Sequence, residues 1–190
     1  MKKLQDFQKL VISNALNAKG LQVGEKAPDF TLPNALGHTT SLASYLKSGC
    51  VILKFYRGEW CPICNLDLRE TQQYVSQFNK LNAKIIAISP QKPNDALTVS
   101  EKNNLVFEVL SDSNQNIIKA YNLQFDPGID YHKRRDLSVL NGANLITLPV
   151  PATFIIDKDF TIIAAHVEAN YTERMSPSEI LKVLQDKNKE

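Results

Sequence analysis

The chain has 190 residues, of which 43% are hydrophobic and 22% charged, and its formal net charge is +2. This length predicts one packed domain, and this composition excludes an intrinsically disordered protein. The near-neutral charge excludes nucleic acid as an expected partner, because the basic run His132-Lys133-Arg134-Arg135 is too short to form more than a small patch.

The pattern of apolar residues and cysteines excludes two further classes of protein. No stretch approaches the ~20 apolar residues that cross a bilayer, so we expect no membrane partner. Polar residues follow Met1-Lys2-Lys3 and interrupt any signal-peptide core, which favours a cytoplasmic protein. Three cysteines are too few for a disulfide scaffold, so a close pair in a reducing compartment indicates redox catalysis or metal binding.

Before the expected core, the chain carries an extension over residues 1–22. Apolar residues recur at helical spacing over residues 3–18 and predict an amphipathic helix. This helix is expected to pack on the core or on a second subunit, which allows a homodimer. Residues 27–40, which are broken by prolines and Gly37, predict a hairpin.

From residue 51 onward, strands and helices are expected to alternate, which is typical of a mixed sheet with helices on both faces. The expected strands are 51–56, 84–89, 106–110, 152–156 and 161–166. The expected helices are 61–81, 94–102, 113–122 and one that begins after Ser176, where Pro177 and Glu179 complete a capping box. Residues 124–148 show no regular pattern and predict a long irregular segment.

The run Trp60-Cys61-Pro62-Ile63-Cys64 directly follows a predicted buried strand. Two cysteines at this spacing lie on one face of a helix's first turn, where free backbone N–H groups and the helix dipole stabilise a thiolate. Arg57, four residues before Cys61, is the expected neighbouring cation. The pattern therefore predicts redox chemistry through a dithiol and a disulfide. A zinc site would need two more ligands, and Cys50 and the three histidines are isolated, so no metal is expected.

Three segments resemble the alkyl hydroperoxide reductase/thiol-specific antioxidant superfamily of peroxiredoxins: 27–32, 55–64 and 151–157. The second resembles a peroxiredoxin-like subgroup that carries a thioredoxin-style CxxC. The resemblance implies an α/β, thioredoxin-like fold over residues 23–188, preceded by the helical extension. It also implies an enzyme that reduces hydroperoxides without a bound cofactor, using electrons from a thioredoxin- or glutathione-type donor.

The resemblance leaves two assignments of the sulfur atoms open. Compared with peroxiredoxins, Cys64 occupies the position of the attacking cysteine, while Cys61, Arg57 and Pro151 replace the Thr, Pro and Arg of the peroxide site. Compared with thioredoxin, Cys61 is the exposed nucleophile and Cys64 its buried partner. Pro151 then stands at the cis-proline position, where the backbone of Val150 would bind the substrate.

Several other residues have two possible roles. Trp60 is expected either in the core or as a lid over the disulfide. Tyr171, Glu173 and Arg174 follow the last expected strand, and we expect them either to approach the active-site face or, in preference, to lie at the solvated surface. Residues 124–148 precede Pro151, and we expect them to overhang the cysteines and select the substrate. Two alternative functions stay open: reduction of protein disulfides, and a non-catalytic thioredoxin-fold binding module.

Overall fold

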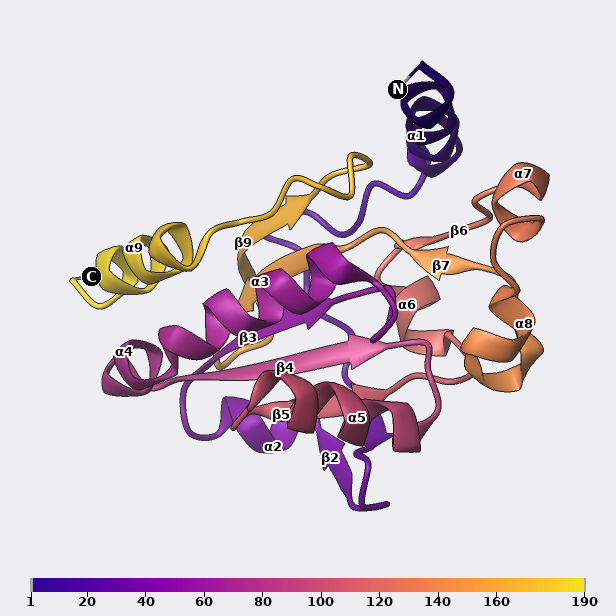
Figure 1. Ribbon diagram of the computed structural model, residues 1–190. Coiled ribbons are helices and arrows are strands. Elements are labelled where there is room, and N and C mark those ends of the chain that lie inside the picture. Colours follow the sequence, from indigo (N-terminus) through magenta and orange to yellow (C-terminus); the bar gives the residue numbers. More distant parts are fainter. Residues whose placement is uncertain (1, 190) are drawn as a thin grey trace.

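The computed structural model describes residues 2–189, except for the side chains of residues 2–4 and 96–98. Its centre is a five-stranded mixed sheet with the strand order β5-β4-β3-β8-β9 (Figure 1). The strands are β3 (Cys50–Phe55), β4 (Ala83–Ser89), β5 (Glu108–Ser111), β8 (Ala152–Ile156) and β9 (Ile162–Val167). The first three are parallel to one another, whereas β8 runs antiparallel to β3 and to β9. The expected mixed sheet is therefore confirmed.

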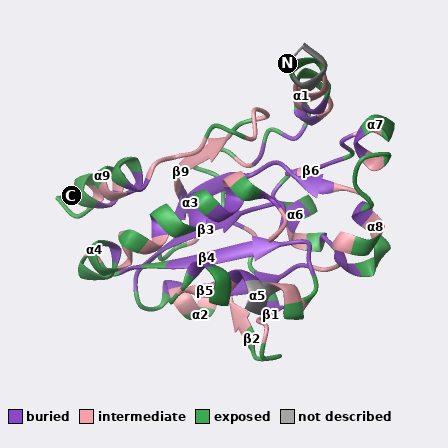
Figure 2. Ribbon diagram, viewed as in Figure 1, coloured by how far each residue is buried: buried purple, intermediate pink, exposed green. Residues whose placement is uncertain are grey.

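Helices cover both faces of this sheet because successive side chains of the central strands point to opposite faces. On one face lie α3 (Pro62–Gln73), α4 (Val75–Lys80), α5 (Pro93–Asn103) and α9 (Pro177–Lys187), as Figure 1 shows. On the other lie α2 (Leu42–Leu46) and α6 (Asn116–Ala120). In β3, Leu53 packs with α2 and α6, while Ile52 packs with α4 and α9. β3 and β8 are buried throughout, and β4 is buried except at Lys84 (Figure 2).

The N-terminal extension forms α1 (Lys2–Ala15), which packs on the main core through Val11 and Ala15, each 1% exposed. The predicted hairpin is confirmed as β1 (Thr31–Pro33) paired antiparallel with β2 (Thr39–Ser41). The predicted capping box is also confirmed, because the Ser176 side chain accepts from the Glu179 N–H and the Glu179 carboxylate accepts from the Ser176 N–H. No helix in the described range is long and apolar enough to span a membrane.

Two expectations about secondary structure are wrong. The expected single helix over 61–81 divides at Tyr74 into α3 and α4. The Thr71 hydroxyl donates to the Asp67 carbonyl at 2.7 Å, and such bonding within a helix bends it. The Tyr74 N–H then bonds to the Thr71 carbonyl three residues back, so the last turn tightens.

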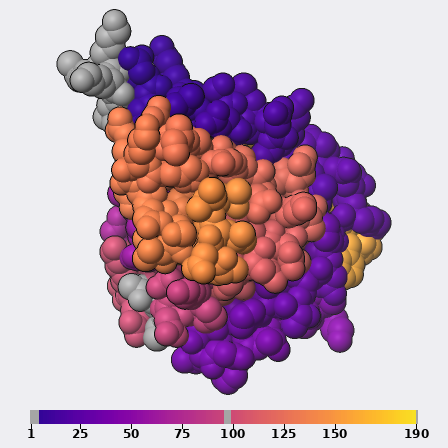
Figure 3. All heavy atoms as spheres, turned by 90° about the vertical axis from the view of Figure 1, so that its right-hand side faces the viewer, coloured from indigo at the N-terminus to yellow at the C-terminus, as the bar shows by residue number. Residues whose placement is uncertain are grey.

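The second wrong expectation is that residues 124–148 are irregular. They contain β6 (Gln124–Phe125) paired with β7 (Leu148–Pro149), together with α7 (Ile129–His132), α8 (Leu137–Leu140) and the 3-10 turn η1 (Gly142–Asn144). Elements of two to four residues are too short to produce a periodic pattern. The buried side chains of Tyr131 and Leu137 fix the segment to the core. Its surface lies beside α1 (Figure 3).

We expect Phe154→Ala to lower the free energy of unfolding by ~3–5 kcal/mol, because it removes a buried ring and leaves a cavity. Phe154 is 0% exposed, and its ring contacts the rings of Phe55 and Tyr121. Urea denaturation measures this change. The matched control is Val139→Ala at a side chain that is 71% exposed, where the change should stay within ~0.5 kcal/mol. Equal stability of the two variants would contradict this packing.

Candidate active site

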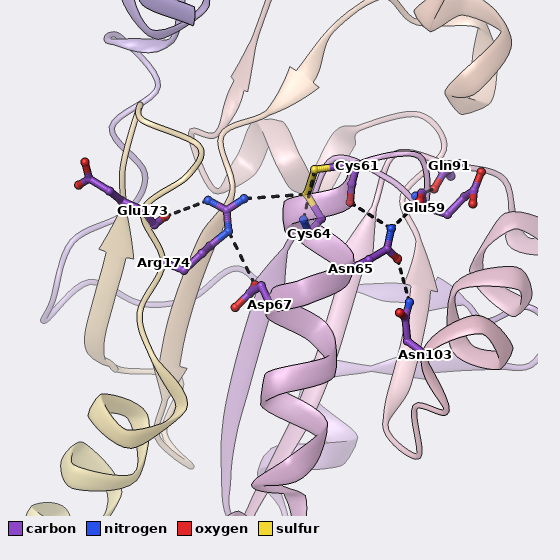
Figure 4. Close-up of a disulfide and its surroundings, with 9 residues drawn as sticks. All are labelled: Glu59, Cys61, Cys64, Asn65, Asp67, Gln91, Asn103, Glu173 and Arg174. Atoms are coloured by element: carbon purple, nitrogen blue, oxygen red, sulfur yellow. Dashed lines mark hydrogen bonds and ion pairs between the residues drawn. A yellow bond between two sulfur atoms is a disulfide. The ribbon is translucent and has the colours of Figure 1, made fainter.

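The cysteine pair lies where β3 passes into α3. Cys61 is the N-cap residue of α3, and its sulfur accepts the Cys64 N–H at 3.3 Å. Pro62 occupies the first helical turn, where its missing N–H removes no intrahelical bond. The Asn65 side chain donates to the carbonyls of Glu59 and Cys61 at 2.6 and 3.0 Å, which fixes the loop before the helix (Figure 4). The helix N-terminus therefore points at the first sulfur, as the sequence predicts.

Cys61 and Cys64 are joined by a disulfide, and their Cα atoms are 5.3 Å apart. The prediction that Cys61 is exposed is wrong, because Cys61 is only 4% exposed and Cys64 only 1%. Surrounding side chains cover the pair from several segments of the chain. However, Cys61 lines a pocket of about 310 Å³. Small molecules can therefore reach the pair from the side of Cys61.

Arg174, in the segment between β9 and α9, lies against the second sulfur. Its Nη2 is 3.9 Å from the Cys64 Sγ, and its Nε is 3.8 Å from the Asp67 carboxylate (Figure 4). The preferred surface position is wrong for Arg174, whose side chain is only 12% exposed and takes the alternative position at the active-site face. Tyr171 also lies at this face, where it lines the pocket, whereas Glu173 is exposed as expected. Burial lowers the pKa of the Arg174 guanidinium, and the Asp67 carboxylate opposes that shift. A cation at this place stabilises a Cys64 thiolate.

Beneath α3 lies a buried ion pair that the sequence analysis missed. The Lys54 Nζ is 2.8 Å from the Asp67 carboxylate, and the two side chains are 2% and 9% exposed. Asp67 thus bridges Lys54 and Arg174, so one carboxylate stands between two cations beside Cys64. Lys54 within an otherwise apolar strand is the signal that could have revealed this pair, because a buried ammonium needs a partner.

Arg57 is held by aromatic rings on the side of Cys61. It is 3% exposed, and its guanidinium lies 4.1 Å from the ring centre of Tyr171 and 5.9 Å from that of Phe125. Burial lowers its pKa to about 10, which still leaves it charged at neutral pH. Its Nε and Nη2 have no hydrogen-bond partner among the described residues. Arg57 and Cys61 line the same pocket, so the expected cation is present on this side.

The overhang expected of residues 124–148 is present. Arg135 lies 4.6 Å from the ring centre of Trp60, and Arg134 lies 4.0 Å from that of Phe7. The Phe7 ring, from α1, stacks on Tyr131 at 5.8 Å. All five residues line the pocket beside Cys61. Trp60 is therefore part of the wall next to the pair, and selection of a substrate by this segment stays a prediction.

The cis-proline expectation is wrong. No peptide bond in the described part of the chain is cis, so Val150–Pro151 is trans. The Val150 N–H donates to the Leu123 carbonyl at 2.8 Å, next to the pairing of β6 with β7. This bond removes the Val150 N–H from substrate binding. Within the described residues, no three His, Cys, Asp or Glu side chains are grouped so that they could hold a metal ion.

The AhpC/TSA family profile matches residues 23–165. The chain belongs to the AhpC/TSA family. The matched range contains the hairpin, the cysteine helix and most of the central sheet described above. The chain is a peroxiredoxin-like thiol oxidoreductase.

Individual relatives agree with this assignment. A Mycobacterium tuberculosis protein named as a peroxiredoxin is 29% identical over 152 residues, which are 80% of this chain and 88% of the relative. Thiol-disulfide oxidoreductase ResA of Geobacillus kaustophilus is 27% identical over 138 residues, which are 72% of this chain and 64% of the relative. The crystal structure of peroxidoxin BcpB from Mycobacterium tuberculosis superimposes with a TM-score of 0.72 at 19% identity, covering 87% of this chain and 97% of that one. This last likeness concerns the fold.

We expect Arg174→Gln to raise the pKa of the Cys64 thiol by about one unit, because the guanidinium stabilises the thiolate. The rate of alkylation by iodoacetamide as a function of pH measures this pKa in a Cys61→Ser background, where Cys64 reacts alone. Arg69→Gln removes an exposed charge from the same helix and serves as the control. An unchanged alkylation profile in Arg174→Gln would show that the guanidinium does not act on Cys64.

Proposed function

We propose that the protein is a thiol peroxidase in which Cys61 and Cys64 cycle between a dithiol and a disulfide. The observation that carries this proposal is a cysteine pair at a helix N-terminus, flanked by guanidinium groups, with its first sulfur lining a pocket. The helix N-terminus and the guanidinium groups both lower the pKa of a thiol, and the thiolate is the reactive form. A reducing compartment such as the cytoplasm would keep the pair reduced between turnovers.

In the first step, the Cys61 thiolate attacks the terminal oxygen of a hydroperoxide in the pocket. The O–O bond breaks, and the leaving alkoxide takes a proton from solvent, so an alcohol forms and Cys61 becomes a sulfenic acid. The Cys64 N–H and the helix dipole stabilise the attacking thiolate. The geometry supports Cys61 rather than Cys64 in this role because Cys61 lines the pocket.

In the second step, the Cys64 thiolate attacks the Cys61 sulfur. Hydroxide leaves the sulfenic acid and is protonated to water, and the two cysteines form the disulfide present in the structure. Arg174 keeps Cys64 ready for this step as a thiolate. A thioredoxin- or glutathione-type donor then supplies two electrons and two protons through thiol–disulfide exchange, which restores the dithiol.

Two observations favour reduction of protein disulfides as a second function. The CxxC pair and the relation to ResA, which is named a thiol-disulfide oxidoreductase, fit exchange with another disulfide. The burial of both cysteines and the position of Val150 argue against a long peptide at the pair.

A homodimer stays a prediction, for which the exposed Leu10 and Leu16 offer apolar surface near α1.

The two cysteines should respond differently when each is left alone with one equivalent of hydrogen peroxide. We expect Cys64→Ser to accumulate a sulfenic acid on Cys61, at least about tenfold faster than Cys61→Ser oxidises on Cys64, because only Cys61 lines the pocket. Trapping with dimedone and mass spectrometry measure both rates. Cys50→Ser is the control, since burial raises the pKa of that thiol to about 11 and keeps it unreactive.

Faster oxidation of Cys64 would reverse the two roles and support the peroxiredoxin-type assignment. Slow oxidation of both variants, combined with rapid reduction of insulin by the reduced protein, would establish the disulfide reductase instead. Inactivity in both assays would indicate a non-catalytic binding module.

A further inference from the structure

The pocket beside Cys61 carries three positive charges. Arg57 lies within it, while Arg134 and Arg135 are exposed residues at its edge. Among the described residues, no carboxylate lines this pocket, and none of its arginines forms a recorded ion pair. Two carboxylates, Asp6 and Asp130, line an adjacent hollow, but Asp130 pairs with Lys133. The pocket therefore has an excess of positive charge, which an anion would neutralise.

Arg57 supplies the buried part of this positive charge. The residue is 3% exposed, lines the pocket, and has two nitrogen atoms, Nε and Nη2, without a hydrogen-bond partner in the described structure. Both nitrogen atoms are inaccessible, and the Tyr131 side chain hydrogen-bonds to the same guanidinium, so Arg57 supplies fixed positive charge in the pocket wall. The guanidinium groups that a ligand can reach are those of Arg134 and Arg135. A carboxylate suits them because its two oxygens match the planar donors of a guanidinium.

The remaining walls of the pocket are apolar. They consist of aromatic rings and aliphatic side chains from α1, the cysteine loop, α7 and the segment after β9: Phe7, Trp60, Pro62, Ile63, Tyr131 and Tyr171. Arg134 and Arg135 lie over two of these rings, which fixes their guanidinium groups at the edge. A volume of about 310 Å³ is at the lower end of the ~300–1,000 Å³ typical of small-ligand sites. A pocket of this size and lining suits a small organic molecule with an apolar body.

We propose that this arginine pocket binds a small organic hydroperoxide that carries a carboxylate, with the carboxylate at the arginines and the peroxide at Cys61. The inference rests on the proposed peroxidase function and adds the chemical class of its substrate. The rings hold the apolar body and the arginines hold the anion, so the reacting oxygen is positioned by the far end of the molecule. A glutathione-type thiol has the same carboxylate chemistry, and the experiment distinguishes the two ligands.

The test compares matched substrates. We expect kcat/KM for 4-carboxycumene hydroperoxide to exceed that for its methyl ester and for cumene hydroperoxide by about tenfold, because only the first carries an anion. The Arg134→Gln/Arg135→Gln double variant should reduce this ratio at least about threefold. Lys133→Gln removes a neighbouring exposed charge outside the pocket and should keep the wild-type ratio.

Binding can be measured without turnover, because Trp60 is the single tryptophan of the chain and lines the pocket. We expect 4-isopropylbenzoate to change the Trp60 fluorescence at about tenfold lower concentration than 4-isopropylbenzamide, and this difference should shrink at high salt. Equal titrations with the acid and the amide, or an unchanged acid-to-ester ratio in the double variant, would overturn the proposal.

The same titration distinguishes a carboxylate-bearing substrate from a glutathione-type reductant. It also distinguishes failure of the carboxylate site from failure of the peroxidase function. If S-methylglutathione binds in a manner that depends on the arginines and 4-isopropylbenzoate does not, the anion belongs to the reductant and the substrate assignment is overturned. If no hydroperoxide is turned over, the peroxidase function fails and the assignment of a hydroperoxide fails with it. Arginine-dependent binding of 4-isopropylbenzoate in that case would retain only the carboxylate site.

Discussion

The buried ion pair between Lys54 and Asp67 is the constraint on which the cysteine site depends. An ammonium group in the middle of β3 needs a carboxylate, and removal of either partner of a buried pair typically costs ~3–5 kcal/mol. This requirement fixes α3 over β3 with Asp67 facing the sheet. The second oxygen of the same carboxylate lies near Arg174, which in turn contacts Cys64. The position of the helix and the electrostatic environment of the second sulfur are therefore linked through one side chain.

The first sulfur has a different environment. Cys61 receives an N–H from the helix and faces a pocket whose walls come from α1, the cysteine loop, the segment around α7 and the segment after β9. Arg57 is the buried cation of that pocket. The two sides of the disulfide therefore have different roles. Arg174 supports Cys64, the cysteine that closes the disulfide, and the pocket controls which molecules reach Cys61, the cysteine that is oxidised. Changes in the pocket can alter the substrate without altering the redox pair.

The sequence predicts well what depends on neighbouring residues. Continuous apolar runs predict β3 and β4, the Ser176 capping box predicts the last helix, and the cysteine spacing predicts the redox pair. Contacts between distant segments are not predicted: Arg174 lies 110 residues from Cys64 in the chain, and nothing local marks it as buried. Cys61 is less exposed than a helix start suggests because distant side chains cover it. The short elements between residues 124 and 148 cannot be predicted from the sequence, because each is too short to produce a periodic pattern of apolar residues.

The most direct test of the central claim is a count of free thiols after the reduced protein reacts with one equivalent of hydroperoxide in the absence of any donor. The chain has three cysteines, so the count should fall from three to one, and peptide mapping should show a Cys61–Cys64 disulfide with Cys50 still free. A count that stays at three, or a disulfide that includes Cys50, would contradict the proposed cycle.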